Sequence, residues 1–174
     1  MSRVSDVATV HMMMADYAQA EAGKLNIIGA TVTVIGRAPD VGVTVPFSLV
    51  VLLEVPPDHY GEECAFKITL EDASGALVTV PGTTPGDEPQ PVVQINQTAR
   101  FAEPTPSPHL RFPEQYRQGY LPARVYLVIG FPNGLPLASG EGYRWRVTLD
   151  NQARDEWTAG FVVAEQVSQQ LSSS

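Results

Sequence analysis

The strongest constraint on the fold is a pattern of alternating apolar and polar residues near the end of the sequence. In residues 143–150 every second position is apolar, and these positions are Tyr143, Trp145, Val147 and Leu149. After a polar connection, residues 151–156, the pattern returns in Trp157, Ala159, Phe161 and Val163. An alternation with period two predicts a strand buried on one face, and two such strands predict a β-hairpin. Because an isolated hairpin is only marginally stable in water, its two tryptophans need a second layer to pack against.

Further strand patterns supply this second layer. The chain has 174 residues with 15 prolines and 14 glycines, which favours one domain with many turns and no long helix. Patterns typical of strands occur in residues 7–15, 25–36, 47–55, 64–71, 76–80, 93–101 and 124–131. We therefore expect an all-β fold, an antiparallel two-sheet β-sandwich of eight or nine strands with long proline-rich loops. An immunoglobulin-like order of strands is one form of this sandwich, and a β-barrel is the alternative.

The limits of the domain follow from where the apolar period ends. Residues 1–164 are expected to form a single β-sandwich domain, and residues 165–174, which lack a core pattern, a flexible polar tail. Near the N-terminus, residues 16–23 are small and polar and predict a connection between strands. The apolar positions then change parity beside Gly29, which predicts a bulged or broken strand.

Several segments resemble a family of short bacterial proteins. They are Ala15-Asp16-Tyr17-Ala18, Gly23-Lys24-Leu25-Asn26-Ile27-Ile28-Gly29, Phe47 to Pro56, and Tyr143-Arg144-Trp145. The family is common in actinobacteria and has no assigned function. The resemblance covers most of the chain except the proline-rich middle and the tail. It implies a compact β domain and transfers no catalytic residue.

The pattern of reactive side chains does not predict catalysis or metal binding. His11, His59 and His109 lie far apart and lack the paired spacing of zinc ligands. Cys64 falls within a strand pattern and has no basic neighbour that would favour its thiolate. Neighbouring acids such as Glu62 and Glu63 point to opposite faces of a strand or lie in loops, so they do not form an acid/base pair. We therefore expect a protein that is not an enzyme and that uses no cofactor or metal.

The charge of the chain limits its partners and its location. A net charge of −8 disfavours nucleic acid as a partner, because phosphate backbones repel an acidic protein. The sequence has neither an apolar run long enough for a membrane span nor a secretory signal pattern, so we expect a location in the cytoplasm or within an assembled particle. The charge is uneven: residues 38–99 contain nine acids and one base, whereas residues 100–154 contain seven arginines and four acids. Such polarity favours head-to-tail contact between copies.

Tyrosine and arginine residues are the candidates for contact with a partner, because both types are enriched at protein interfaces. The candidate partner-binding residues are Arg111, Tyr116, Arg117 and Tyr120 in an aromatic and basic segment, and Arg144 and Arg146 on the polar side of the hairpin. The predicted function is that of a non-enzymatic interaction or assembly module. It would bind a protein partner or a copy of itself, as a homo-oligomer or as a component of a virus or other particle. The alternative is a small-molecule-binding domain or weak enzyme with a pocket between sheet and proline-rich loops, lined by Trp145, Trp157, Tyr116 or Tyr120.

Overall fold

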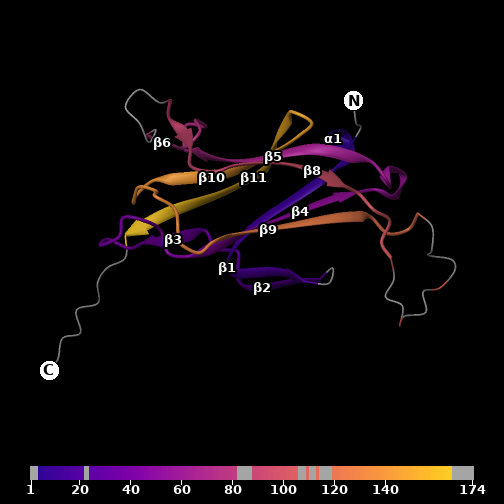
Figure 1. Ribbon diagram of the computed structural model, residues 1–174, viewed down its shortest axis with the longest axis horizontal. Helices are drawn as coiled ribbons and strands as arrows, with labels where there is room; N and C mark the ends of the chain where they lie inside the picture. Colours follow the sequence, from indigo (N-terminus) through magenta and orange to yellow (C-terminus); the bar gives the residue numbers. More distant parts are fainter. Residues whose placement is uncertain are drawn as a thin grey trace.

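Two β-sheets lie face to face in the structure, a computed structural model (Figure 1) that describes residues 4–21, 24–81, 88–105, 109, 113 and 119–165. The helical segments are α1 (Val4–Val7) and the 3-10 helix η1 (Pro57–His59). The strands are β1 (Thr9–Glu21), β2 (Lys24–Ala30), β3 (Val34–Arg37), β4 (Phe47–Val55), β5 (Glu63–Asp72), β6 (Thr79–Val80), β7 (Gln90–Pro91), β8 (Gln94–Arg100), β9 (Ala123–Phe131), β10 (Gly142–Leu149) and β11 (Gln152–Glu165).

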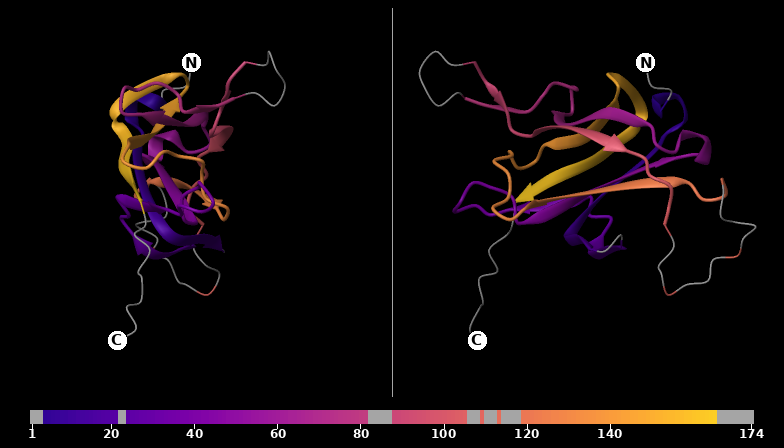
Figure 2. Two further views of the ribbon diagram at one scale, coloured as in Figure 1. Left: turned by 90° about the vertical axis from the view of Figure 1, so that its left-hand side faces the viewer. Right: turned by 45° about the vertical axis from the view of Figure 1, so that its right-hand side comes forward.

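The strand order defines a sandwich. One sheet, the β4 sheet, has the order β2-β1-β4-β9, and the other, the β10 sheet, has the order β3-β11-β10-β5-β8. Neighbouring strands are antiparallel except β3 and β11, which are parallel. Figure 2 shows the two sheets as separate layers, with the ribbon of β6 and β7 projecting from one end. The predicted all-β, two-sheet sandwich is confirmed, with four strands in one sheet and five in the other, whereas β6 and β7 form a separate ribbon.

The topology also explains which edges of the sandwich are open. In strand order, β1, β4 and β9 take the places of immunoglobulin strands A, B and E, whereas β11, β10 and β5 take those of G, F and C. An immunoglobulin sheet has a further strand, D, beside strand E. No described residue forms a strand there, so β9 is the edge of the β4 sheet. The sequence before β9 has prolines at 104, 106, 108, 113 and 122, and proline cannot donate a hydrogen bond to a strand ladder.

The hairpin of β10 and β11 supplies the centre of the core. Trp145 and Trp157 are 0% and 1% exposed. The Trp145 indole stacks on Phe131 and Phe161, with ring centroids 5.5 and 6.1 Å away. Its Nε1 donates a hydrogen bond to Sδ of Met14 at 3.2 Å. Since Phe131 and Met14 belong to the β4 sheet, Trp145 joins the two layers.

The N-terminal hairpin differs from the expectation. The residues from Asp16 to Glu21 are not a connection, because they continue β1 and pair with β2, with Tyr17 opposite Ile28. Main-chain hydrogen bonds to β2 hold these small and polar residues in an extended conformation. Such pairing does not need alternating apolar residues. The irregularity predicted at Gly29 is a break: Gly29 has a φ of 63°, and after Ala30 the chain leaves the β4 sheet and enters the β10 sheet as β3.

The turn of the C-terminal hairpin is also shorter than the predicted connection of residues 151–156. Asp150 and Asn151 have φ values of 48° and 65°, and two positive φ values are typical of a two-residue hairpin turn. Strand β11 therefore starts at Gln152, and residues 154–157 lie opposite Val147 in an irregular part of the ladder. At the other end β11 includes Glu165, whereas the rest of the predicted tail lies outside the described residues.

Candidate interaction surface

Strand β9 has a main-chain edge that no described strand covers. It pairs with β4 along its whole length, from Ala123 opposite Val55 to Phe131 opposite Phe47. On its other side the described chain supplies no neighbouring strand. The backbone N–H and C=O groups of an edge strand that point away from its neighbour can bind another strand.

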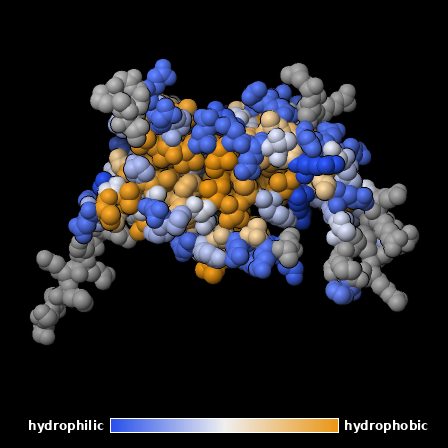
Figure 3. Space-filling view, in the orientation of Figure 1, coloured by the Kyte–Doolittle hydropathy of each residue, from blue (hydrophilic) through white to orange (hydrophobic). Residues whose placement is uncertain are grey.

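Hydrophobic side chains gather beside this edge. Val125, Leu127 and Ile129 of β9 pack against the core but remain partly exposed. So does Ile95 of β8, the edge strand of the other sheet. Figure 3 shows a hydrophobic band across the middle of the molecule, between the strands of the two sheets. Part of the sandwich interior thus faces water, and covering it would be favourable.

The edge of β9 carries almost no charge. Arg124 is the one charged residue between Ala123 and Phe131, and its Nε donates a hydrogen bond to the carboxylate of Glu54 on β4 at 2.7 Å. This hydrogen bond raises the pKa of Arg124 above its ordinary value. Edge strands of natural proteins usually carry lysine, proline or a bulge that prevents pairing with another chain. Strand β9 contains neither lysine nor proline, and its regular register with β4 shows that it has no bulge.

Two of the six partner-binding residues predicted from the sequence, Arg144 and Arg146, lie together on the β10 sheet and not at the edge of β9. On the outer face of the β10 sheet, Nε of Arg144 and Nε of Arg146 donate hydrogen bonds to the two carboxylate oxygens of Glu71, at 2.8 and 2.7 Å. Glu71 is only 7% exposed, so both arginines stabilise a nearly buried carboxylate in addition to any contact with a partner. Tyr120 is exposed, and its neighbours Gly119 and Leu121 lie close to Pro57 and Tyr60, at η1 and directly after it. Arg111, Tyr116 and Arg117 lie outside the described residues.

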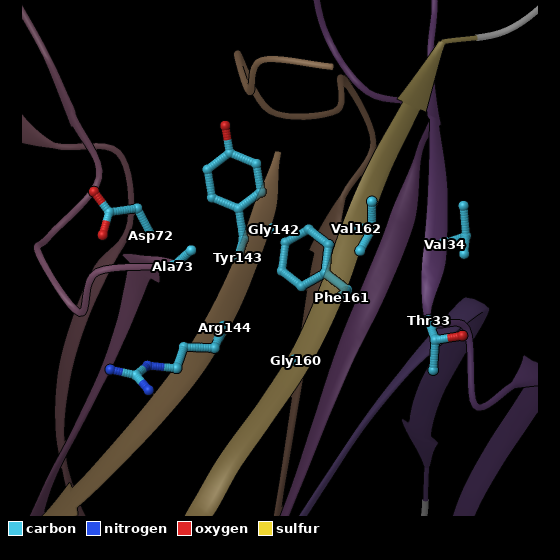
Figure 4. Close-up of a pocket in the computed structure, with 10 residues that line it drawn as sticks. All are labelled: Thr33, Val34, Asp72, Ala73, Gly142, Tyr143, Arg144, Gly160, Phe161 and Val162. Atoms are coloured by element: carbon cyan, nitrogen blue, oxygen red, sulfur yellow. The ribbon is translucent and has the colours of Figure 1, made fainter. Parts of the chain in front are cut away.

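A hollow of about 550 Å³ lies on the β10 sheet (Figure 4). Gly142 of β10 and Gly160 of β11 lie in its middle, with Val34 and Val162 on one side and Arg144 on the other. Neither glycine has a positive φ, and a Cβ atom at Gly142 would meet no atom within 4 Å. At Gly160 an added Cβ would make only an ordinary contact, 3.8 Å from a backbone oxygen. The fold therefore does not require glycine at these positions, and the missing side chains leave the hollow open.

Both surfaces have a signal in the amino-acid sequence. For β9 the signal is a run of five apolar residues, Val125 to Ile129, directly after a proline-rich stretch that cannot supply a regular neighbouring strand. For the hollow the signal is Gly160 in the interior of a strand pattern, where glycine lowers stability, together with Gly142 at the start of the neighbouring strand.

The side chains that could bind a metal ion lie apart in the described part of the chain. Within this part of the chain, no three His, Cys, Asp or Glu side chains are placed to hold a metal ion. Burial raises the pKa of the Cys64 thiol to about 11, so the thiol is protonated at neutral pH. Trp145 and Trp157 are enclosed in the core, and the alternative expectation that they line a pocket is wrong.

No family model matches the chain, and no curated protein or solved structure is significantly similar to it. The resemblance to a family of actinobacterial β domains therefore stays a prediction. No helix in the described part of the chain combines the length and hydrophobicity that crossing a membrane requires.

Proposed function

We propose that the protein is a non-enzymatic interaction or assembly module that binds a polypeptide strand along β9. The observation that carries this proposal is the edge of β9, which no described strand covers, beside the partly exposed Val125, Leu127 and Ile129. An added strand would satisfy the main-chain groups of the edge and cover the hydrophobic band at the same time. The partner is another protein or a second copy, in the cytoplasm or within an assembled particle.

The chemistry of the edge favours an apolar, extended partner. The single charge of β9, on Arg124, is already paired with Glu54, so the edge offers no free cation to a phosphate group. The whole chain carries a net charge of −8, which repels nucleic acid. Main-chain hydrogen bonds would supply much of the affinity, and the side chains that alternate along the added strand would supply specificity.

A lysine at position 127 should weaken binding strongly. Leu127→Lys places an ammonium group beside the incoming strand, while the aliphatic stem of lysine can still cover the core from an edge position. Affinity capture from the source organism, followed by mass spectrometry, should recover partners with the wild-type protein and lose them about tenfold or more with this variant.

Val162→Lys is the matched control for this experiment, because Val162 is 46% exposed on the other sheet. It adds the same charge away from β9 and should retain the partners. Far-UV circular dichroism confirms that both variants are folded. Retention of the same partners by Leu127→Lys, or recovery of nothing above background by the wild-type protein, would contradict the proposal.

The hollow of Gly142 and Gly160 favours a second function, the binding of a small apolar molecule. A glycine in the interior of a strand can mark the close approach of a ligand. Gly160→Val should fill the hollow and raise the free energy of unfolding by about 0.5–1 kcal/mol, because valine suits a strand better than glycine. A thermal-shift screen with small aromatic and aliphatic compounds should find one that raises the Tm of the wild-type protein but not that of the variant. A screen in which no compound makes this distinction counts against a ligand site.

A further inference from the structure

We infer that the strand which pairs with β9 is β9 of a second copy, antiparallel to the first about a twofold axis at Leu127. This inference rests on the proposed function, since it names the partner of the same edge. In a twofold dimer the same surface of each copy forms the interface, so that surface must be complementary to itself. The residues of β9 meet this condition in packing, in charge and in length.

Packing favours pairing about Leu127. In this register Leu127 of one copy faces Leu127 of the other. Across the same interface Val125 faces Ile129, and Tyr126 faces Val128. Pairs of β-branched residues, and pairs of an aromatic with a β-branched residue, stabilise neighbouring strands. The odd-numbered residues of both copies remain on the inner side, so the two hydrophobic bands would join into one covered surface.

The charges of the two strands are also compatible. Arg124 of one copy faces Gly130 of the other, where a Cβ atom would meet no atom within 4 Å, so the long side chain has room. The two copies of Arg124 lie on opposite sides of the axis, about 20 Å apart along the strands. Each arginine keeps its own partner, Glu54, and no two like charges face each other.

Length selects this register among the antiparallel ones. Strand β9 has nine residues, and Leu127 is the middle residue, so only an axis at Leu127 pairs the strand over its full length. The paired edges would be about 30 Å long, which places the interface at the lower end of the size range of specific complexes. We therefore expect a weak dimer that forms as the protein concentration rises.

Salt should strengthen this dimer. Each copy has a net charge of −8, so long-range repulsion opposes association, and added salt screens this repulsion without weakening the apolar contacts. The head-to-tail contact between oppositely charged parts of the chain, which the sequence suggested, would respond in the opposite way, because salt weakens attraction between unlike charges.

Cysteine cross-linking tests both the partner and the register. Leu127→Cys places two thiols opposite each other across the axis, at a separation near that of a disulfide. Under mild oxidation this variant should form a covalent dimer roughly tenfold faster than Val162→Cys, whose thiol lies on the other sheet. The wild-type protein should not cross-link, because Cys64 is buried.

Two further variants report the register. Val125→Cys and Ile129→Cys should each form no covalent dimer alone and should cross-link when they are mixed, because residue 125 of one copy faces residue 129 of the other. The three substitutions introduce a small apolar residue, so the fold should persist, and circular dichroism confirms this. Absence of a Leu127→Cys dimer at high protein concentration and 0.5 M salt would overturn the inference, as would equal cross-linking of Val125→Cys alone. If partners were nevertheless captured through β9, the proposed function would stand with another protein as the partner.

Discussion

Replacing Trp145 by alanine is expected to lower the free energy of unfolding by about 3–5 kcal/mol. The indole is fully buried and stacks on Phe131 and Phe161, so alanine would leave a cavity between the two sheets. The hydrogen bond to Met14 would also be lost. Urea unfolding followed by far-UV circular dichroism measures the difference, because this signal comes chiefly from the backbone of the β-sheets.

Trp145→Phe is the control for this prediction. A phenylalanine keeps an aromatic ring beside Phe131 but cannot donate a hydrogen bond to Met14, so its loss of stability should be clearly smaller. A loss below about 1 kcal/mol for Trp145→Ala would be typical of a surface residue. That result would remove Trp145 from the core and restore it as a candidate for ligand binding.

Gly134→Ala is expected to cost roughly 3 kcal/mol or more. Gly134 lies in the turn after β9 with a φ of 66°, a conformation that disfavours any residue with a Cβ atom. The added Cβ would also collide with the backbone carbonyl of Thr44. To relieve the collision the chain must move Thr44 away from Leu135, with which it shares two hydrogen bonds of 2.9 Å.

Gly140→Ala separates the two causes of this loss. Gly140 has a φ of 82°, but a Cβ there would meet no atom within 4 Å. Its replacement should therefore cost only the conformational term, about 1–2 kcal/mol. Both losses of unfolding free energy are read from urea titrations under the same conditions. Equal losses would show that the collision of the added Cβ atom at position 134 with Thr44 does not lower stability.

The fold class was predictable because the core pattern is local. The alternation from Tyr143 to Leu149 follows from which face of β10 is buried, and the strand patterns before it have the same origin. The ends of elements were harder to predict. The turn at Asp150 and Asn151 depends on two backbone conformations, and the extension of β1 beyond Ala15 depends on pairing with β2 rather than on burial.

The candidate surface depends on contacts between distant segments. Residues of β9 were predicted to form a strand, but whether a strand lies at an edge depends on what the remainder of the chain places beside it. In the same way, the position of Arg144 and Arg146 on a polar face was predictable, whereas their shared partner Glu71 lies on β5, far earlier in the sequence. A local pattern shows which residues are buried, and it does not show which segments meet.

The parallel pairing of β3 with β11 has a consequence for how the protein folds during synthesis. Val34 pairs with Val162, more than a hundred residues later, so the ribosome must release nearly the whole domain before this sheet can be completed. Until then β4, whose residues are apolar on both faces, is not covered by the completed β10 sheet. Contacts between such distant residues also predict slow folding. Newly made chains would therefore depend on protection from aggregation until the last strand is in place.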